Sequence, residues 1–376
     1  MSNPTYIPGL EGVVAAETRL SSVDGQKGEL IIAGFPVEEL APQASHEEVI
    51  FLLWFDRLPT ATELADLKTQ LAEQRCLSEG TIALLRSAAA HPIPTMDALR
   101  MGAASLDLSA HPSRSDRYNA QAVQIVAQLP LIAAAYWRLR QGLEPLPPDP
   151  SLGQAANYLY LLTGEKPSLA QSRALETYLN TVVDHGLNAS TFAARVIIAT
   201  QSDLISAITG ALGALKGPLH GGAPGPALDT VFAIGTADRA EPYLRELLGR
   251  GERLMGFGHR VYKVRDPRAD VLAAAAATLY SADGDRAFYD LAIQVEQVAL
   301  RLLEEHKPGR HLQTNVEFYT ALLLHGLGLP TELFTPTFAI SRAAGWVAHC
   351  LEQQQTGRLM RPQSVYLGVK DRQYQG

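Results

Sequence analysis

Three histidines lie in segments whose composition suits chemistry: His185 in VVDHGLNAST, His220 in KGPLHGGAPGP and His259 in LMGFGHRVYKVRDPRAD. A single histidine is most often a structural residue with satisfied ring nitrogens. His220 and His259 lie in segments with several glycines, however, and because glycine has no Cβ, a ligand or another backbone can come close to these two imidazoles. His220 and His259 are therefore the stronger candidates for a functional role.

The segment around His220 follows a stretch with helical spacing and is rich in glycine. It contains Lys216, Gly217, Gly221, Gly222 and Gly225. A turn of this kind at a helix terminus can direct backbone amides at a phosphate or thioester oxygen, although an ordinary loop between two helices can have the same composition. The sequence has no Walker phosphate loop, serine elbow, paired-cysteine zinc site or HExxH motif, and GFGHRV lacks the third glycine of a dinucleotide-binding fingerprint.

A carboxylate and several arginines could act together with these histidines. Glu317 begins an apolar stretch, NVEFYTALLL, where burial can raise its pKa and make it a general base. A glutamate stabilised by a helix dipole is the alternative. Arginine presents a planar fork that matches a carboxylate, so a dicarboxylate ligand would account for two or three of the nearby arginines; each could also be a solvated surface group. These arginines are Arg260, Arg265, Arg268, Arg342, Arg358 and Arg361.

The elements that must position these residues are almost all helical. Residues 17–40 hold β-branched and apolar residues around Asp24 and Gly25, which predicts a short hairpin near the N-terminus. Apolar residues at three- and four-residue spacing then predict many helices and an all-α fold. The clearest helical segments are 46–56, 119–141, 171–183, 191–215, 285–306 and 315–327.

Two stretches need separate interpretation. Four prolines between residues 143 and 152 predict either a linker between domains or a long surface loop. Residues 118–137 form the longest uncharged stretch, but several glutamines, an asparagine and a proline favour a buried helix over a membrane span.

Composition narrows the functional classes. The chain has 376 residues, 47% of them hydrophobic, enough for one large core or two unequal cores without disulfides. Its 32 basic and 39 acidic side chains give a net charge of −7, so nothing attracts nucleic acid or an acidic membrane globally and local cations must hold any anionic ligand. Two widely separated cysteines, Cys76 and Cys350, and an N-terminus without a signal-like pattern predict a cytoplasmic protein.

Six segments together resemble bacterial-type members of the citrate synthase family. KGPLHGGA, GFGHRVYKVRDPRAD, NVEFY and SRAAGWVAH occur in the family's order and approximate spacing, preceded by ETRLSSVDGQKG and DHGLNAST. The similarity runs from about residue 10 to the end of the chain. It implies an all-α acyl-CoA condensing enzyme in which a large domain, 1–220 and 324–376, and a small domain, 221–323, close over an active-site cleft. It also implies a homodimer, with larger oligomers possible in the family.

The resemblance assigns catalytic roles motif by motif. Glu317 would remove a proton from the acyl methyl group, His220 would hydrogen-bond the thioester oxygen, and His259 would donate a proton or a strong hydrogen bond to the alkoxide. The residues expected to bind the oxo dicarboxylate, oxaloacetate, are His185, Arg268, Arg342 and, from the partner subunit, Arg361.

The resemblance further implies that acetyl-CoA is a co-substrate, with no tightly bound cofactor and no metal required. The residues expected to contact acetyl-CoA are Lys216, Gly217, Leu219, Gly256, Gly258 and Asn315.

Three positions depart from the family pattern. Glu317 stands where the family normally has Asp in NVDFY, and its side chain is longer by one carbon–carbon bond, roughly 1.5 Å. A misplacement of about 1 Å can lower a rate on the order of a hundredfold, so the side chain must fold back, the helix must shift, or activity must be low. Gly186 replaces a common Glu and Pro224 a common Asn, which could alter the pocket or the hinge.

Three functions fit these features. The first is a citrate synthase that condenses acetyl-CoA with oxaloacetate and hydrolyses citryl-CoA. The second is a 2-methylcitrate synthase that uses propionyl-CoA, with Gly186 or Pro224 reflecting a changed pocket. The third is a citrate synthase-like protein that binds its ligands but turns over poorly because of Glu317. The retained histidines and arginines count against the third function, because an inactive site has no physical need for them.

Overall fold

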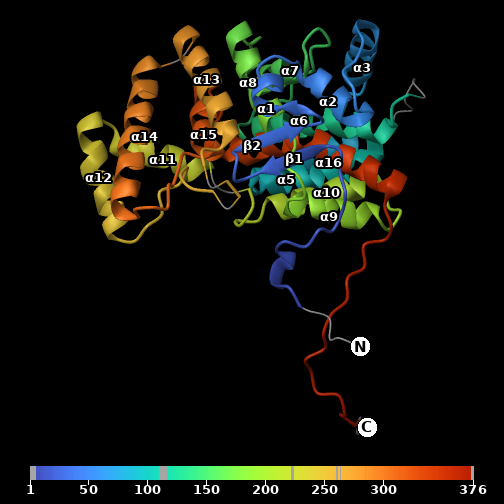
Figure 1. Ribbon diagram of the computed structural model, residues 1–376. Helices are drawn as coiled ribbons and strands as arrows, with labels where there is room; N and C mark the ends of the chain where they lie inside the picture. Colours follow the sequence, from blue (N-terminus) through green and yellow to red (C-terminus); the bar gives the residue numbers. More distant parts are fainter. Residues whose placement is uncertain are drawn as a thin grey trace.

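The computed structural model describes residues 6–109, 117–221, 224–259, 261–262, 264–283 and 285–373. Its fold is all-α with a small N-terminal sheet, as the sequence predicts (Figure 1). The strands are β1 (Ser21–Asp24), β2 (Glu29–Ile32) and β3 (Phe35–Pro36), and the short 3₁₀ helices are η1 (Pro8–Leu10), η2 (Leu106–Ser109) and η3 (Thr331–Leu333). The helices are α1 (Val37–Leu40), α2 (His46–Phe55), α3 (Ala61–Glu73), α4 (Glu79–Ala90), α5 (Thr95–Ala104), α6 (Ala120–Arg140), α7 (Gln154–Thr163), α8 (Leu169–Val182), α9 (Ala189–Ile198), α10 (Leu204–Leu215), α11 (Pro224–Ile234), α12 (Ala237–Gly249), α13 (Pro267–Ala282), α14 (Arg286–His306), α15 (Val316–Gly326) and α16 (Phe334–Thr356).

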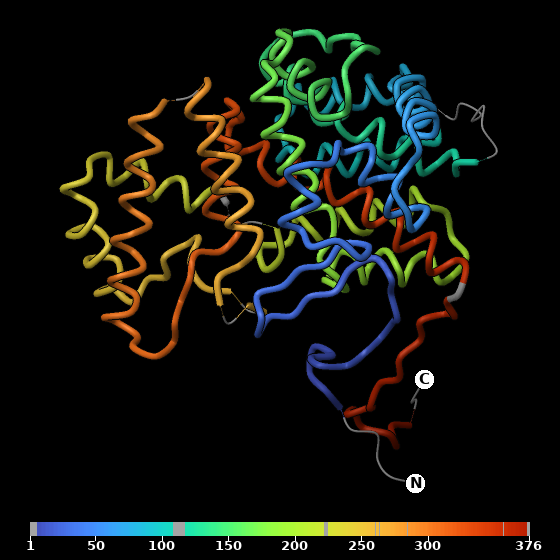
Figure 2. Tube along the Cα trace, turned by 45° about the horizontal axis from the view of Figure 1, so that its top comes forward, coloured from blue at the N-terminus to red at the C-terminus, as the bar shows by residue number. Residues whose placement is uncertain are grey.

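The predicted hairpin is formed by β1 and β2, which pair antiparallel with Asp24 opposite Glu29. The Asp24 carboxylate organises the turn by accepting hydrogen bonds from two backbone N–H groups within it. The tip of the hairpin lies beside the segment that follows His259 (Figure 2). The two are in close contact, since a Cβ built on Gly25 would lie 2.3 Å from the Val261 carbonyl oxygen. The two-residue strand β3 extends the sheet and was not predicted from the sequence.

Side-chain caps determine where the helices beside the site begin. Asn188, Asp266 and Asn315 are the N-cap residues of α9, α13 and α15, and each side chain accepts a hydrogen bond from a backbone N–H of the first turn. These caps lie close in sequence to His185, Arg268 and Glu317. The start of each helix, and with it the direction of the neighbouring functional side chain, is therefore specified locally.

The predicted helical segments are confirmed with one correction. The segment 191–215 contains two helices, α9 and α10, separated by residues 199–203. Gln201 in this break has a φ of 67°, a left-handed conformation that a right-handed helix does not contain. The break turns the chain so that α9 and α10 pack against each other. Apolar spacing alone gives no signal for such a turn when neither glycine nor proline marks it.

The uncharged stretch 118–137 becomes α6, whose residues from Ala122 to Tyr136 are buried. Among the described helices, α6 alone is long and apolar enough to cross a membrane, but 83% of its apolar window is buried inside the protein. The buried-helix interpretation is therefore confirmed. The proline-rich stretch connects α6 to α7, and because these helices pack against each other, it is a loop within one helical body rather than a linker.

α16 is the central helix of the larger part of the molecule, where it contacts α2, α5, α6, α8, α9 and α10 (Figure 1). α11 to α15 lie together to one side, and α13 and α15 contact α8 across the junction. The domain boundaries expected near residues 221 and 323 stay a prediction; the second falls inside α15.

A glycine lets α16 approach the segment that follows α8. A Cβ built on Gly345 would lie 2.2 Å from the Val183 carbonyl oxygen and 3.3 Å from the Cβ of Asp184. A backbone oxygen cannot yield as the end of a flexible side chain can, so this close approach requires glycine.

Replacing Gly345 by alanine is expected to lower the free energy of unfolding by about 1–3 kcal/mol, because overpacking must displace backbone. Urea unfolding measures this change. Gly213→Ala is the matched control, since Gly213 also lies inside a helix but the nearest atom to its Cβ is Arg100 Cδ at 3.9 Å. Alanine at position 213 is expected to stabilise the helix by about 0.8–1 kcal/mol. Similar effects at both positions would contradict the packing argument.

Candidate active site

The six described residues predicted to act in catalysis or to bind the oxo acid within one subunit line a single cavity of about 670 Å³. Each comes from a helix or from a segment next to one: His185 after α8, His220 after α10, His259 before α13, Arg268 in the first turn of α13, Glu317 in the first turn of α15 and Arg342 in α16. The fold thus gathers three histidines, two arginines and a carboxylate from distant parts of the chain.

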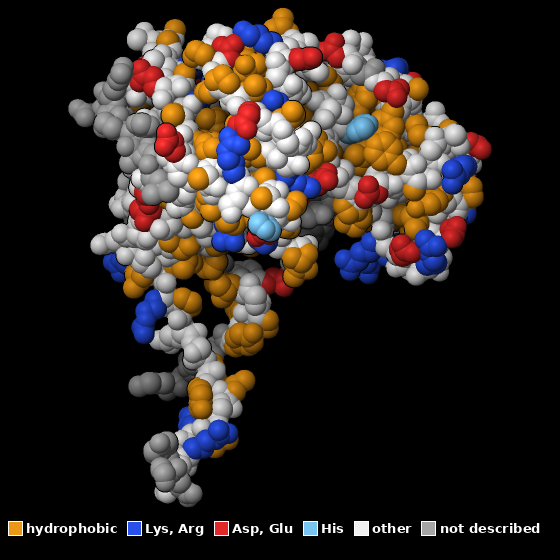
Figure 3. Space-filling view, turned by 180° about the vertical axis from the view of Figure 1, so that it is seen from behind, with side chains coloured by type: hydrophobic (Ala, Val, Ile, Leu, Met, Phe, Trp, Pro, Cys, Tyr) orange, Lys and Arg blue, Asp and Glu red, His pale blue; other side chains and the backbone are white. Residues whose placement is uncertain are grey.

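Three other candidate arginines, Arg265, Arg358 and Arg361, do not line this cavity. Arg361 and Arg358 lie in the exposed C-terminal segment 357–373, which projects below the body together with the N-terminal segment (Figure 3). Arg265 forms ion pairs with Asp270 and Glu296 instead. Arg260, like Gly222 of the glycine-rich segment, lies outside the described residues, and of Pro224 only the backbone is described.

The residues expected to contact acetyl-CoA are placed in two groups. In the first, Leu219 lines the cavity and its side chain is fully exposed. Gly217 belongs to the turn that carries His220, and its carbonyl accepts the His220 N–H at 2.9 Å. Lys216 forms an ion pair with Asp97 on the surface of the larger part of the molecule, so its ammonium group already has a carboxylate partner.

The second group joins the His259 segment to the start of α15. The Asn315 N–H donates to the Gly256 carbonyl at 2.9 Å, and Asn315 Nδ2 donates to the Gly258 carbonyl at 2.7 Å. Gly256 and Gly258 have φ values of 90° and 78°, which favour glycine. These three residues therefore set the position of His259 relative to Glu317, whatever they contribute to ligand binding.

The hydrogen bonds of His259 assign its proton. Its Nδ1 accepts from the backbone N–H groups of Val261 and Tyr262, both at 3.0 Å. The proton of the neutral ring is therefore on Nε2, which lies 3.4 Å from Arg268 Nη2. Two donors this close to each other are suited to share an anionic oxygen.

His220 is held by Ser190 and, through it, by Trp346. Its Nε2 accepts from the Ser190 N–H at 3.3 Å and contacts Ser190 Oγ at 2.7 Å. Ser190 Oγ in turn accepts from Trp346 Nε1 at 3.2 Å. The proton of the neutral His220 ring is therefore on Nδ1. Burial, together with the charge of Arg342, lowers the pKa of His220 and keeps the ring neutral.

His185 lies beside His259, with 6.1 Å between the ring centroids, and its Nε2 contacts Tyr262 Oη at 3.1 Å. Burial lowers the pKa of His185 well below 6.5, and the guanidinium groups of Arg268 and Arg342 lower it further. At neutral pH this ring is uncharged, so the positive charge of the cavity comes from its arginines.

The two cavity arginines are buried, but only one has a carboxylate partner. Arg268 donates Nε and Nη2 to the two oxygens of Asp266, at 3.0 and 2.8 Å. Burial lowers the pKa of Arg268, but the Asp266 carboxylate outweighs it and the net shift is upward. Arg342 donates Nε to the Val182 carbonyl at 2.7 Å, and it forms no ion pair with any carboxylate in the described part of the chain. Burial lowers the pKa of Arg342 to about 10.

Glu317 has the environment of a general base. Its backbone N–H donates to the Asn315 cap at 2.9 Å, while its side chain faces the cavity. Burial raises the pKa of Glu317, the nearby Asp266 raises it further, and Arg268 opposes both. This upward direction is the one expected for a buried general base, whereas a helix dipole acting alone would lower the pKa.

Several residues that position the site side chains were not predicted from the sequence. Asp266 binds Arg268 and also accepts the Val316 N–H at 3.3 Å, so it links the arginine to the helix of Glu317. Ser190 and Trp346 hold His220. Asp266 before Pro267 has the pattern of a helix N-cap, but no local signal marks Ser190 or Trp346. Within the described part of the chain, no group of three or more His, Cys, Asp or Glu side chains is arranged to hold a metal ion.

Known proteins resemble this chain over nearly its whole length. The family profile for the citrate synthase C-terminal domain matches residues 9–363. The chain is 41% identical to the citrate synthase of Haloferax volcanii, with 96% of each chain covered. It is 42% identical to citrate synthase 2 of Bacillus subtilis, covering 97% of this chain and 96% of that protein. It is also 38% identical to a 2-methylcitrate synthase of Mycobacterium tuberculosis, covering 98% of this chain and 92% of that protein.

Solved structures agree as well. The crystal structure of citrate synthase from Pyrobaculum aerophilum has a TM-score of 0.87 and 37% sequence identity, covering 97% of this chain and 93% of that one. The ternary complex of the Thermoplasma acidophilum citrate synthase with carboxymethyl coenzyme A and oxaloacetate has a TM-score of 0.83 and 30% identity, covering 97% of each chain.

The neutral state of His185 predicts a specific pH dependence of stability. Below its ordinary pKa of about 6.5 the unfolded chain binds a proton at this residue that the folded state does not, so stability is present above pH 6.5 and is lost as pH falls. When the pH falls from 6.5 to 5.5, the free energy of unfolding should decrease in both proteins. The decrease is expected to be about 1 kcal/mol smaller in His185→Gln than in the wild type. Urea unfolding at the two pH values measures the difference. An equal loss in both proteins would mean that folded His185 accepts the proton.

Proposed function

Because the chain belongs to the citrate synthase family, we propose that it condenses acetyl-CoA with oxaloacetate and hydrolyses the citryl-CoA formed to citrate and CoA. The observation that carries this proposal is one cavity that combines two buried guanidinium groups with a carboxylate whose pKa is raised. The guanidinium groups suit a small dianion, and the carboxylate suits removal of a proton from carbon.

In this proposal the oxo acid binds first, against Arg268 and Arg342. A buried cation without a carboxylate partner is costly in the free protein, and an incoming carboxylate removes that cost. Arg342 forms no direct ion pair in the described part of the chain, and the nearby Asp184 offsets only part of the effect of its burial, which supports its role as a ligand for one carboxylate of oxaloacetate. The Nε2 proton of His259, 3.4 Å from Arg268, is then the donor to the oxo group. His185 lies beside His259 and lines the same side of the oxo acid site in this proposal.

Enolisation follows between Glu317 and His220. Glu317 removes a proton from the methyl group of acetyl-CoA, and its raised pKa makes it a stronger base than an exposed carboxylate. The Nδ1 proton of His220 donates a hydrogen bond to the thioester oxygen as negative charge develops there. The enolate carbon attacks the carbonyl carbon of oxaloacetate, and His259 donates a proton or a strong hydrogen bond to the resulting alkoxide. Water then cleaves the thioester and releases CoA.

Propionyl-CoA is the alternative acyl donor, and the product would then be 2-methylcitrate. The 38% identity to a 2-methylcitrate synthase is the observation that favours it. A protein that only binds these ligands is less well supported, because both the base and the proton donors share the cavity with the arginines.

We further propose a cytoplasmic homodimer in which Arg361 of one copy reaches the oxo acid of the other. Both cysteines are unpaired, in keeping with a reducing compartment. The C-terminal segment that carries Arg361 exposes several large apolar side chains: Leu359, Val365, Tyr366, Leu367 and Val369. Apolar side chains on an extended segment are more stable when a second chain covers them. The two ligands are supported by the Thermoplasma acidophilum enzyme, whose ternary complex contains oxaloacetate and carboxymethyl coenzyme A.

Glu317 can be tested by thiol release from acetyl-CoA in the presence of oxaloacetate. Glu317→Gln keeps the shape but removes the base, and we expect kcat to fall by a factor on the order of 10²–10⁴. Glu317→Asp withdraws the carboxylate by roughly 1.5 Å, and we expect a loss on the order of a hundredfold. Propionyl-CoA, assayed in parallel, separates the two acyl donors.

Two outcomes would contradict the assignment of Glu317. If Glu317→Gln is as active as the wild type, another group is the base. If Glu317→Asp is more active by an order of magnitude or more, the native carboxylate is displaced from the reacting position. Retained thermal stabilisation by oxaloacetate shows that each variant still binds the oxo acid.

Arg342 can be tested without turnover. Oxaloacetate at a hundred times its Kd is expected to stabilise the wild type by about 2.7 kcal/mol, and Arg342→Gln should abolish this stabilisation. Arg75→Gln is the matched control: Arg75 is also buried, but its Nε binds Gln154 and it lies outside the cavity. We expect Arg75→Gln to lower stability and retain the oxaloacetate effect. An unchanged effect in Arg342→Gln would remove Arg342 from the oxo acid site.

A further inference from the structure

One face of α16 carries three polar side chains directed at the site. Arg342, Trp346 and His349 follow each other at spacings of four and three residues, which places them on the same side of a helix. Arg342 lines the cavity and Trp346 bonds to the Ser190 hydroxyl that holds His220. His349 has no part in the proposed reaction, yet it contacts the residue that precedes His185.

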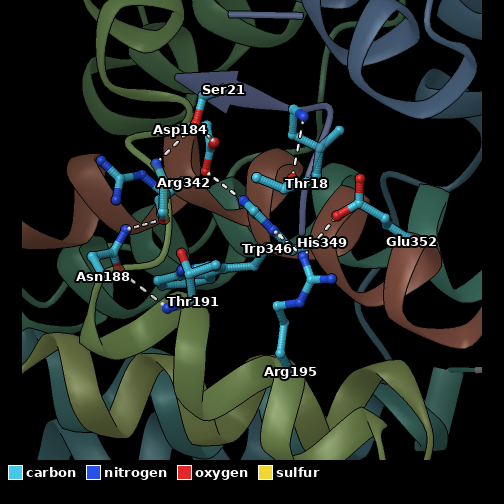
Figure 4. A network of polar contacts seen from close by, with 12 residues as sticks. Thr18, Ser21, Asp184, Asn188, Thr191, Arg195, Arg342, Trp346, His349 and Glu352 are labelled. Atoms are coloured by element: carbon cyan, nitrogen blue, oxygen red, sulfur yellow. Dashed lines mark hydrogen bonds and ion pairs between the residues drawn. The ribbon is translucent and has the colours of Figure 1, made fainter. Parts of the chain in front are cut away.

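His349 is fully buried between a carboxylate and a guanidinium (Figure 4). Its Nδ1 lies 2.8 Å from Arg195 Nη1, and its Nε2 lies 3.1 Å from Asp184 Oδ1. Arginine can only donate, so Nδ1 is the acceptor and the proton of the neutral ring is on Nε2. His349 therefore donates a hydrogen bond to Asp184. Contacts at both ring nitrogens thus fix the orientation of the imidazole.

The Asp184 carboxylate also bonds to Ser21, which links it to Gly186 on the other side of His185. Its Oδ2 accepts from Ser21 Oγ at 2.5 Å, and Ser21 Oγ accepts from the Gly186 N–H at 2.9 Å. Residues 184 and 186 are thus both fastened, one on each side of His185. Burial alone would raise the pKa of Asp184, but His349, Arg342 and Ser21 together hold it below its ordinary value, so the carboxylate stays ionised.

Arg195, the partner of His349 Nδ1, is itself held by hydrogen bonds. Arg195 donates to Glu352 at 2.7 Å and to Gln353 at 3.0 Å, and these residues lie on α16 one turn beyond His349. Glu352 also accepts the Arg19 N–H at 3.0 Å, just before β1. The His349 ring cannot rotate without breaking its bonds to Arg195 of α9 and to Asp184 after α8.

We infer that His349 is a positioning residue for the oxo acid site: it holds Asp184 and, with Ser21, fixes the backbone on both sides of His185. The inference rests on the proposed function, in which His185 contacts the oxo acid. His349 touches no reacting atom, so its loss should weaken oxo acid binding and leave the chemical step largely intact.

Two variants of His349 separate positioning from packing. Glutamine places an amide N–H near the position of Nε2 and can still donate to Asp184. Asparagine places its amide near the position of Nδ1 and reaches only Arg195. We expect His349→Asn to raise the KM for oxaloacetate about tenfold, equivalent to about 1.4 kcal/mol. The kcat and the KM for acetyl-CoA should change less than about threefold, and His349→Gln should restore the oxaloacetate KM to within about threefold of the wild type.

His46→Gln is the control for a general loss of buried histidine. His46 is also buried, and its Nδ1 bonds to Asn180 at 3.0 Å, but neither residue lines the cavity. This variant should melt at a lower temperature with an unchanged KM for oxaloacetate. If His349→Asn is too unstable to assay, Ser21→Ala removes the other bond of the same carboxylate and should raise the same KM.

Imidazole ¹⁵N spectra of the ligand-free protein give a readout that does not require turnover. The His185 signals should shift in His349→Asn and stay in place in His349→Gln. Unchanged His185 signals in His349→Asn, or equal increases in KM for the two variants, would overturn the inference. Absence of thiol release by the wild type would instead contradict the proposed function, and the spectra would still decide the role of His349.

Discussion

The close contact between α16 and the segment 182–190 is the constraint on which the site depends. Gly345 removes the side chain that would keep the two apart, and Arg342 then bonds directly to the Val182 carbonyl. With the backbones this near, side chains on one face of α16 can reach both histidine segments of the larger part of the molecule. A change in this packing would displace His185, His220 and Arg342 together, because all three take their positions from the same contact.

Burial of charge explains the chemistry of the cavity. Uncharged imidazoles and buried guanidinium groups give the site a positive charge although the whole chain carries −7. The same burial raises the pKa of Glu317, so one environment suits both the proposed anion site and the proposed base. Asp266 connects the two, since its carboxylate binds Arg268 and the first N–H groups of α13 and α15. An oxo acid bound to Arg268 would therefore be connected, through Asp266, to the helix that carries Glu317.

The N-terminal hairpin contributes to the site from outside it. Its tip contacts Val261 and Val264, on either side of Tyr262, and Tyr262 bonds to His185. Ser21, at the start of β1, bonds to Asp184. A short sheet in a helical protein is thus explained by its contacts: it supports the segments of His185 and His259, which have no regular secondary structure of their own.

The sequence by itself determined the all-α class, the hairpin and the six charged or histidine residues that line the cavity, because apolar spacing, turn residues and residue types in ordered motifs are local properties. It could not locate the break at Gln201, which neither glycine nor proline marks, or the role of Asp184 and His349, which depends on a contact between residues 165 positions apart. Nor could it separate Arg342, which is buried, from Arg361, which is exposed on an extended segment. Only the tertiary structure decides these points, because burial and hydrogen-bond partners follow from packing rather than from the chain's local order.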